Sequence, residues 1–234
     1  MKTAANRIAL ITGASRGLGA AVAKRFAKEG MQVILLGTHL EGLTETDDAI
    51  RTNGGSAILV QLDLTDSTKI QELAEMISTR FGKLDILVGN AGLLGEMTPI
   101  IHTTPEEWDR TMAVNLTANM QLIRCFDPLL KASDAPRAIF VTSGVTNGVH
   151  PYWNAYAVSK AALETLVTTY AAENLKTALK ANLVNPGALR TRMRAQAFPG
   201  EDPDTLTMPD AATDIFVTLA SPACRDTGKI FRAQ

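Results

Sequence analysis

Excess charge, cysteine and long apolar runs are all scarce in this chain of 234 residues. The formal net charge is −1, so the basic excess that nucleic acid or an anionic membrane attracts is missing. No apolar run approaches the roughly 20 residues of a membrane span. The two cysteines, Cys125 and Cys224, lie in apolar helical contexts, which predicts buried thiols in a reducing cytoplasm. The three histidines lack metal-ligand spacing, and we expect no metal site.

What the chain does contain is enough apolar sequence for a full core. It is 46% hydrophobic, and we expect one dinucleotide-binding catalytic domain over residues 1–234. The stretch MKTAANRIALITGAS runs straight into a glycine loop, which predicts a strand and not a signal peptide. Residues 186–208, rich in Pro, Gly, Arg and Asp, predict a long substrate loop.

Short apolar runs alternate with longer amphipathic segments along the whole chain. This alternation predicts an α/β fold of the Rossmann type, a doubly wound parallel sheet with helices on both faces. The predicted strands are Ile8–Thr12, Gln32–Leu36, Ala57–Leu62, Asp85–Val88, Ala138–Thr142, Ala181–Val184 and Lys229–Phe231. Helices are predicted near 18–29, 41–52, 67–80, 105–131, 154–175 and 209–220.

The glycine-rich segment TGASRGLG follows the first predicted strand and precedes the first predicted helix. Gly13, Gly17 and Gly19 are spaced to allow a tight turn, with Ser15 and Leu18 between them. Such a turn brings a pyrophosphate close to backbone amides at a helix N-terminus. Because the pattern has the required strand before it and helix after it, it predicts dinucleotide binding.

The residues around the second strand favour NADP(H) over NAD(H), with NAD(H) still possible. A NAD site usually has a carboxylate at the end of that strand, which bonds the ribose 2′-hydroxyl. Here Gly37 occupies that place, followed by Thr38. Arg16 lies inside the glycine loop, where a guanidinium can meet a 2′-phosphate with two hydrogen bonds.

Several polar residues sit at predicted strand ends or on the helices that follow. Ser143 ends the fifth predicted strand, thirteen residues before Tyr156, and the segment YAVSK places Tyr156 and Lys160 on one helix face. VGNAG ends the fourth strand, NPG at 185–187 ends the sixth, and Asn115 lies within the long fourth helix. Ligands of parallel α/β sheets bind outside the carboxyl ends of the strands.

In these motifs, their order and their spacing, the chain resembles the short single-domain branch of the short-chain dehydrogenase/reductase family from about Ile8 to Phe231. The resemblance implies that Tyr156 is the catalytic acid/base, that Lys160 activates it and binds the ribose, and that Ser143 orients the carbonyl. It implies that Asn115 holds a water of a proton relay at a local break in its helix. It also implies cofactor contacts at Thr38, Asp63, Leu64, Asn90, Ala91, Gly92, Pro186, Gly187 and Thr191, with Asp63 on the adenine amine and Thr191 on the nicotinamide amide.

The chemistry of the residues agrees with an oxidoreductase that interconverts a carbonyl and an alcohol. The cofactor supplies the hydride, and a side chain must supply the proton. A phenol has a pKa near 10, so we expect the Lys160 ammonium, helped by an oxidised nicotinamide ring, to lower the pKa of Tyr156 by about 3 units.

Two other functions remain open. The first is a 3-oxoacyl-thioester reductase, whose acyl carrier would dock on Arg190, Arg192 and Arg194. The second is a protein that senses NADP without catalysis, although such a protein should have lost Ser143, Tyr156 or Lys160. The expected substrate is a small molecule with an apolar body. Its expected pocket residues are Leu93, Leu94, Val145, Tyr152, Trp153, Met193 and Phe198.

The predicted helices 105–131 and 154–175 carry more apolar residues than one face against a sheet requires. A helix that is apolar over a wide arc usually has a second partner. By family resemblance that partner is the same helix pair of a second subunit, which predicts at least a homodimer. The chain stops soon after TGKIF, without the family's customary glycine-containing tail, and this leaves a tetramer open.

Overall fold

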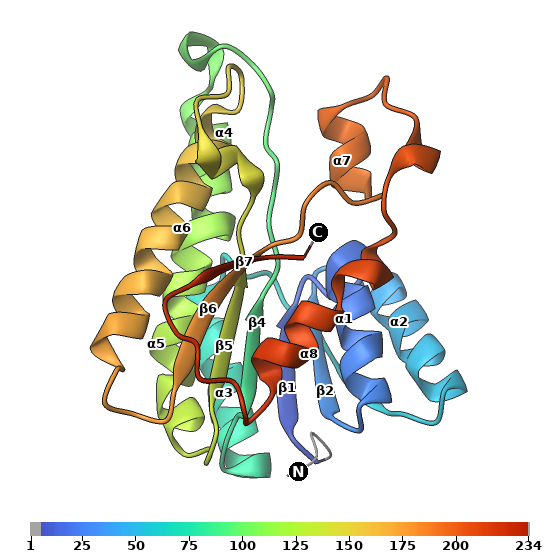
Figure 1. The fold of residues 1–234 in the computed structure, drawn as a ribbon, viewed down its shortest axis with the longest axis vertical. Coiled ribbons are helices and arrows are strands. Elements are labelled where there is room, and N and C mark those ends of the chain that lie inside the picture. Colours follow the sequence, from blue (N-terminus) through green and yellow to red (C-terminus); the bar gives the residue numbers. More distant parts are fainter. Residues whose placement is uncertain (1–5, 234) are drawn as a thin grey trace.

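The computed structural model of the chain describes residues 6–233 and contains a seven-stranded, wholly parallel sheet (Figure 1). The strand order is β3-β2-β1-β4-β5-β6-β7, so the winding direction reverses between β1 and β4. Residues 1–5 of the N-terminal stretch lie outside the described residues, but the strand predicted after them is present. The predicted Rossmann-type fold is confirmed.

The seven strands lie within about two residues of their predicted positions. Their bounds are β1 Ile8–Thr12, β2 Gln32–Gly37, β3 Ala57–Gln61, β4 Ile86–Gly89, β5 Arg137–Val141, β6 Lys180–Asn185 and β7 Ile230–Arg232. The α-helices are α1 Gly17–Lys28, α2 Leu40–Thr52, α3 Ser67–Phe81, α4 Pro105–Met112, α5 Ala118–Lys131, α6 Asn154–Glu173, α7 Arg192–Ala197 and α8 Asp214–Ala220.

Two hydrophobic cores cover the two faces of the sheet. Strand side chains alternate between faces, so Ala9 and Ile11 belong to one core while Ile8 and Leu10 belong to the other. Helices α1, α2 and α8 close the first face, and α3, α5 and α6 close the second (Figure 1). Because both faces are covered, the central strands are continuous apolar runs, as in the fully buried pattern of β1.

Three segments differ from the elements that sequence periodicity predicts. The helix 105–131 is interrupted by a π-helical turn at Ala113–Thr117, where the resemblance implied a local break. The stretch 186–208 is not a plain loop, since it contains α7 and a 3-10 turn at Pro203–Thr205. The predicted helix 209–220 divides into a 3-10 turn, Pro209–Ala212, and α8. Periodicity cannot separate these helix types, because they differ by only one residue in hydrogen-bond register.

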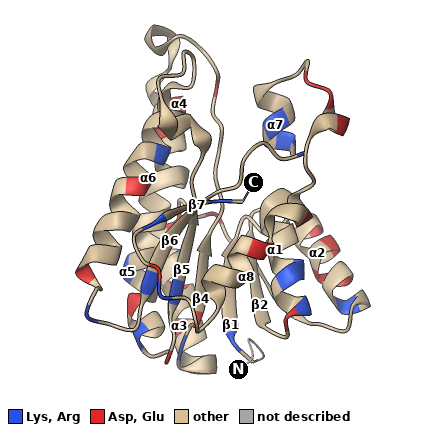
Figure 2. Ribbon diagram, viewed as in Figure 1, with Lys and Arg blue, Asp and Glu red and all other residues tan. Residues whose placement is uncertain are grey.

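Within residues 6–233, no helix is long and apolar enough to cross a bilayer. The same part of the chain has no group of three or more His, Cys, Asp or Glu side chains arranged to hold a metal ion. Lys and Arg are interspersed with Asp and Glu over the outer helices (Figure 2).

Candidate active site

The glycine loop between β1 and α1 has the backbone conformation that its sequence predicts. Gly13 and Gly17 have φ angles of 65° and 56°, a left-handed conformation that favours glycine. A Cβ added at Gly19 would overlap the Gly13 carbonyl oxygen. A side chain at position 19 would therefore push α1 away from β1. The loop thus keeps the helix N-terminus and its free amides close to the strand end, which fits a pyrophosphate.

The turns after β1 and β2 lie next to each other. A Cβ added at Gly37 would lie 3.6 Å from the Ser15 side chain, and the adjacent residues Arg16 and Thr38 are both exposed. Gly37 ends β2 and is buried against α2. The position therefore carries no carboxylate that could bond a ribose 2′-hydroxyl. Arg16 and Thr38, with the exposed His39 beside them, are therefore polar side chains that these two turns offer to a 2′-phosphate.

At the end of β3, Asp63 has a defined geometry. Its Oδ1 accepts hydrogen bonds from the Thr65 amide and the Thr65 hydroxyl, both at 2.9 Å. These two bonds hold the pKa of the Asp63 carboxyl below its usual value. The side chains of Leu18 and Leu64 are only 8% exposed and belong to the cores. Little of either side chain is therefore exposed to a cofactor.

Asn90 has a role that the sequence did not predict. Its Nδ2 donates to the carbonyls of Thr12 and Gly13, at 2.8 and 3.3 Å. The Thr12 hydroxyl in turn accepts from the amides of Asn90 and Ala91. The side chain of Asn90 therefore fastens the end of β4 to the glycine loop. Two residues on, Gly92 brings this segment toward Asn115 and Lys160, since a Cβ added there would lie 3.3 and 3.6 Å from their polar atoms.

Asn115 lies in the π-helical turn and is fully buried. Its Oδ1 accepts from the Leu93 amide at 2.7 Å, and its Nδ2 donates to the Leu93 carbonyl and the Ser159 hydroxyl, each at 2.9 Å. Its own carbonyl accepts from the Asn119 side chain at 2.8 Å. The predicted local break in the helix is present, and the Asn115 side chain ties the segment after β4 to α6.

Tyr156, Lys160 and Ser143 come together where β5 meets α6. Lys160 is 3% exposed, donates to the Val141 carbonyl at 2.8 Å, and its Nζ lies 5.8 Å from the centre of the Tyr156 ring. Burial lowers the pKa of Lys160 to about 8, and the charge of Glu164 opposes this effect.

Our expectation for the Tyr156 phenol is wrong for the protein by itself. Burial raises the pKa of Tyr156, and a hydrogen bond with Ser143 only partly opposes the rise. The desolvation of the phenolate outweighs any stabilisation by Lys160 in this geometry. At neutral pH the phenol is therefore protonated.

The segment after β6 returns to the glycine loop. Gly187, with φ 75°, donates its amide to the Asn185 side chain just after the strand, and Pro186 lies between them. Thr191 caps α7 by accepting from the Arg194 amide, and its methyl group would lie 3.5 Å from a Cβ added at Gly17. Thr191 therefore lies beside the start of α1, near the proposed pyrophosphate position.

An apolar cluster lies around Tyr156. It contains Leu94 and Val145, with Trp153 and Met193 packed against them. The Trp153 ring lies 5.8 Å from Tyr156 and 5.9 Å from Phe198. Five of the seven predicted pocket residues are thus brought together. Leu93 instead contributes its backbone to Asn115, and Tyr152 is 58% exposed with φ 74°.

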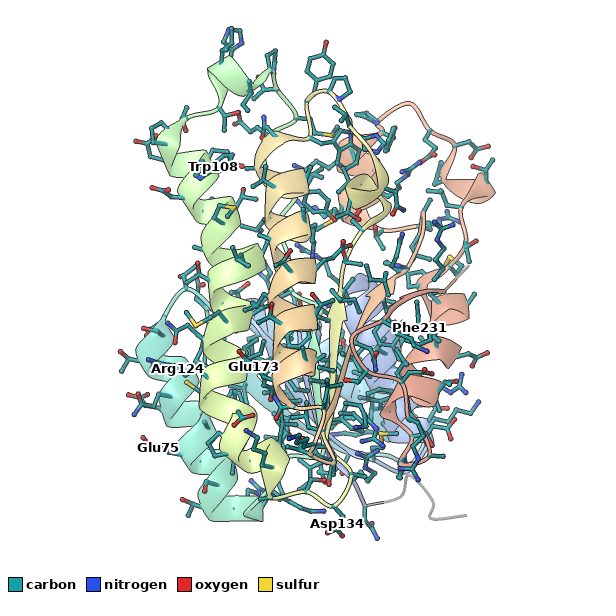
Figure 3. The ribbon with its side chains drawn as sticks, turned by 60° about the vertical axis from the view of Figure 1, so that its left-hand side comes forward. Glu75, Trp108, Arg124, Asp134, Glu173 and Phe231 are labelled. Atoms are coloured by element: carbon teal, nitrogen blue, oxygen red, sulfur yellow. The ribbon has the colours of Figure 1, made fainter. Side chains whose placement is uncertain are left out.

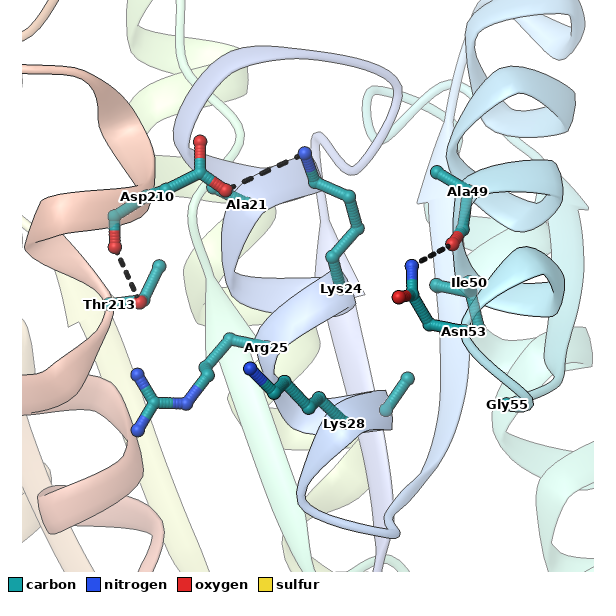
Figure 4. Close-up of a pocket in the computed structure, with 11 residues that line it drawn as sticks. Ala21, Lys24, Arg25, Lys28, Ala49, Ile50, Asn53, Gly55, Asp210 and Thr213 are labelled. Atoms are coloured by element: carbon teal, nitrogen blue, oxygen red, sulfur yellow. Dashed lines mark hydrogen bonds and ion pairs between the residues drawn. The ribbon is translucent and has the colours of Figure 1, made fainter.

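A groove of about 380 Å³ lies elsewhere, between α1, α2 and the turn Pro209–Ala212 (Figure 4). Two of its three basic residues face carboxylates, with Lys24 lying 3.6 Å from Asp210 and Arg25 paired with Asp214. The groove lies along the side of α1 and contains none of the predicted site residues.

Sequence reasoning missed three residues of this network. Ser159 receives the Asn115 amide and donates to the Tyr156 carbonyl. Asn119 bonds the Asn115 carbonyl, and Glu164 bonds residues on both sides of Ser143. The spacing 156, 160, 164 along one helix face was the available signal for Glu164.

A doubly wound parallel sheet with a glycine loop at its first crossover, and a buried Tyr–Lys pair beside the switch point, defines a nucleotide-dependent α/β oxidoreductase. The family profile described as short chain dehydrogenase matches residues 7–202. The chain belongs to the short chain dehydrogenase family and is an NAD(P)-dependent oxidoreductase.

Individual relatives match over nearly the whole chain. The oxidoreductase YciK of Escherichia coli (strain K12) is 37% identical over 98% of this chain and 92% of its own length. A short chain dehydrogenase of Shigella flexneri 2a str. 301, solved in complex with NADP, superposes with a TM-score of 0.95 at 37% identity and full coverage of both chains. Another, of Escherichia coli CFT073 in complex with NADPH, superposes with a TM-score of 0.94 at 38% identity, covering 100% of this chain and 99% of its own.

Proposed function

We propose that the protein interconverts a carbonyl and an alcohol using NADP(H), with Tyr156 as the acid/base. The observation that carries this proposal is the convergence of three groups. Tyr156 is buried, lies within reach of Ser143 and is next to the buried Lys160, and an apolar cluster surrounds its ring. A buried titratable pair, Tyr156 and Lys160, with a hydroxyl beside it is suited to proton transfer.

Each of the three residues has a distinct task. In the reducing direction the protonated phenol donates its proton to the substrate oxygen while Ser143 holds that oxygen by a hydrogen bond. The phenolate left behind is stabilised by the ammonium of Lys160, which is still largely protonated at neutral pH. Asn115 fixes the segment after β4 against α6 and so keeps these groups in register. When bound, the cofactor supplies the hydride and, once oxidised, a positive charge near the phenolate.

The cofactor fits the glycine loop, with its adenosine end over the turns after β2 and β3. NADP(H) is favoured because Arg16 and Thr38 are exposed there and Gly37 replaces an acid. The preference is further supported by two similar proteins, named above, that were solved in complex with NADP and NADPH. NAD(H) can use the same cradle without the 2′-phosphate contacts.

We expect NADP(H) to bind more tightly than NAD(H) by about 1–3 kcal/mol, the range for hydrogen bonds to charged groups. Arg16→Ala should remove most of this difference, because the guanidinium supplies the bidentate contact. Calorimetric titration of the wild type and of Arg16→Ala with NADP(H) and NAD(H) measures this difference in affinity. The exposed Arg232 on β7 provides a matched control, and Arg232→Ala should leave the difference intact. Equal affinities in the wild type would contradict the preference.

The substrate body that fits best is apolar, since the walls next to Tyr156 are Leu94, Val145, Trp153 and Met193. The direct test is a screen of the purified enzyme with NADPH against ketones, diketones, quinones and 3-oxoacyl thioesters. Oxidation of NADPH by at least one apolar carbonyl compound is expected. No turnover with any of these classes would argue against the proposed reaction.

The alternative of a thioester reductase with a basic carrier-docking patch is less well supported. Arg194 makes two 2.6 Å hydrogen bonds to Glu201 and stacks on Phe198 at 3.8 Å. Arg190 is paired with Asp204 at 2.8 Å. Acidic residues stand beside the basic ones of α7 (Figure 2). Two of the three candidate arginines are thus neutralised within the chain. Family membership also argues against a protein that only senses the cofactor.

We also propose that the chain forms a homodimer through α5 and α6, which lie side by side at one surface (Figure 3). The outer stripe of α6 is uncharged along Val158, Ala161, Thr165 and Thr169, and Met120 of α5 is 37% exposed. Such a face suits a two-fold helix pair. The molar mass of the assembly in solution also distinguishes a dimer from a tetramer.

Light scattering at low micromolar concentration should give about twice the chain mass of 25.0 kDa. Thr165→Arg, in the middle of the uncharged stripe, should give a monomer, because two guanidinium groups would meet near the axis. Thr79→Arg on the exposed face of α3 is the matched control and should remain dimeric. A wild-type monomer with full activity would refute the dimer.

A further inference from the structure

Glu164 lies one helical turn beyond Lys160 on α6 and makes two hydrogen bonds to another element. Its Oε1 accepts from the Thr142 hydroxyl at 2.6 Å and lies 2.9 Å from the Thr146 hydroxyl. Neither threonine is on α6. Thr142 follows β5 directly, and Thr146 belongs to the 3-10 turn Gly144–Asn147. One carboxylate oxygen therefore joins α6 to the turn that follows β5.

This turn is the one that carries Ser143. The two threonines lie one residue before and three residues after Ser143, so they hold the turn on both sides of it. Within the turn, the Ser143 side chain accepts from the Val145 amide at 3.3 Å, and the Thr146 hydroxyl also lies 2.9 Å from the Ser143 carbonyl. Lys160 of α6 holds the end of β5 through the Val141 carbonyl, and Glu164 is the α6 side chain that holds the turn on both sides of Ser143.

We propose that Glu164 is a positioning residue that sets Ser143 against Tyr156 and Lys160. The inference rests on the proposed function, because it assigns Glu164 a task only if those three residues act on the substrate oxygen. Tyr156, Lys160 and Glu164 share one face of α6 at intervals of four residues. The helix thus presents the acid/base and its cation, and it also fixes the third group through Glu164.

Glu164 also acts on Lys160 by its charge. The groups that face Lys160 are Tyr156 and Glu164 from α6, the Val141 carbonyl from β5, and Gly92 from the segment after β4. The negative charge of Glu164 favours the ammonium form and opposes the lowering of the Lys160 pKa by burial. A role confined to packing would not include this electrostatic effect.

Glu164→Leu tests the positioning role, because it removes the acceptor while keeping an apolar side chain of similar size. We expect kcat to fall about tenfold or more, since small misplacements of catalytic groups are costly. The Kd for NADPH should stay within about twofold, because the proposed role of Ser143 is to hold the substrate oxygen and not the cofactor. Thr142→Val should lower kcat in the wild type and add little in the Glu164→Leu background, as for residues that act as a unit. Glu173→Leu, exposed at the end of the same helix, is the matched control.

Glu164→Gln tests the charge, because the amide oxygen can still accept from both threonines. Loss of the negative charge lowers the Lys160 pKa, so the ammonium is lost at lower pH. The fall of kcat/KM at high pH in the reducing direction should therefore move toward lower pH by about half a unit or more. If Glu164→Leu does not fold, Thr142→Val still tests the positioning role, because it removes one of the two hydroxyls that Glu164 holds.

The outcomes separate this inference from the proposed function when Tyr156→Phe is measured in the same assay. Loss of turnover in Tyr156→Phe together with a tenfold loss in Glu164→Leu supports both. Loss in Tyr156→Phe with kcat of Glu164→Leu within about twofold of wild type overturns the positioning role alone. An unmoved pH profile in Glu164→Gln overturns the electrostatic effect on Lys160. Full activity of Tyr156→Phe overturns the proposed function itself.

Discussion

Tyr156→Phe is expected to lose nearly all turnover while binding NADPH within a few-fold of the wild type. The substitution removes the proton donor and keeps the ring that packs between Lys160 and Trp153. Groups that act as general acids usually contribute about 10²–10⁴ in rate, so kcat should fall by at least about 100-fold. Steady-state kinetics with a substrate from the screen and calorimetry with NADPH measure the two effects separately.

Tyr170→Phe is the matched control for this experiment. Tyr170 is a second buried tyrosine of α6, and its hydroxyl donates to Asp127 at 2.8 Å. Removing this hydroxyl should lower stability slightly and leave kcat near the wild-type value, because Tyr170 lies near the C-terminal end of α6 and Tyr156 near its N-terminal end. Retention of more than about a tenth of wild-type kcat in Tyr156→Phe would show that the acid/base is another group.

Arg137→Ala is expected to reduce the free energy of unfolding by about 4 kcal/mol, because it leaves several buried carbonyls unpaired. Arg137 is 2% exposed at the start of β5. Its guanidinium donates to the carbonyls of Pro136, Ala178, Ser221, Pro222 and Cys224 at 2.8–3.3 Å. These carbonyls come from three separate segments of the chain. One side chain therefore holds the three segments together at the N-terminal end of β5, the end opposite Ser143.

Urea unfolding of the wild type and of Arg137→Ala measures this difference in the free energy of unfolding. Arg137→Lys keeps a charge but offers fewer donors in a compact head, so its loss should be intermediate. Arg232→Ala removes an exposed arginine from β7 and should stay within about 0.5 kcal/mol of the wild type. A loss below about 1 kcal/mol in Arg137→Ala would mean that solvent or a rearranged C-terminal segment satisfies the freed carbonyls.

Much of the fold could be predicted because its signals are local. β1 was predicted with its observed bounds, since an apolar run enclosed by polar residues marks both ends of a buried strand. The glycine loop was equally readable, because only glycine favours the positive φ found at Gly13 and Gly17. The π-helical turn around Asn115 was not readable from periodicity. The resemblance alone implied a break, and its partners Leu93 and Ser159 come from distant segments.

The candidate site divides in the same way. The spacing of Tyr156 and Lys160 placed them on one helix face, as the structure has them. The sequence did not show that the Asn90 side chain also binds the glycine loop, because the Thr12 and Gly13 carbonyls come within its reach only in the folded chain. The expected lowering of the Tyr156 pKa was wrong for the protein itself, because burial is a property of the packed site and outweighs the nearby charge.

The sequence by itself determined the succession of strands and helices along the chain, the glycine turn and the Tyr–Lys spacing, because each depends on residues only a few positions apart. Only the tertiary structure decided which polar groups meet across elements. Glu164 reaches the threonines on both sides of Ser143 because α6 packs against the end of β5, and Arg137 finds its carbonyls because β5, β6 and the C-terminal segment converge. Those contacts follow from the packing of distant segments, and a buried polar group takes the partners that this packing brings within hydrogen-bonding distance.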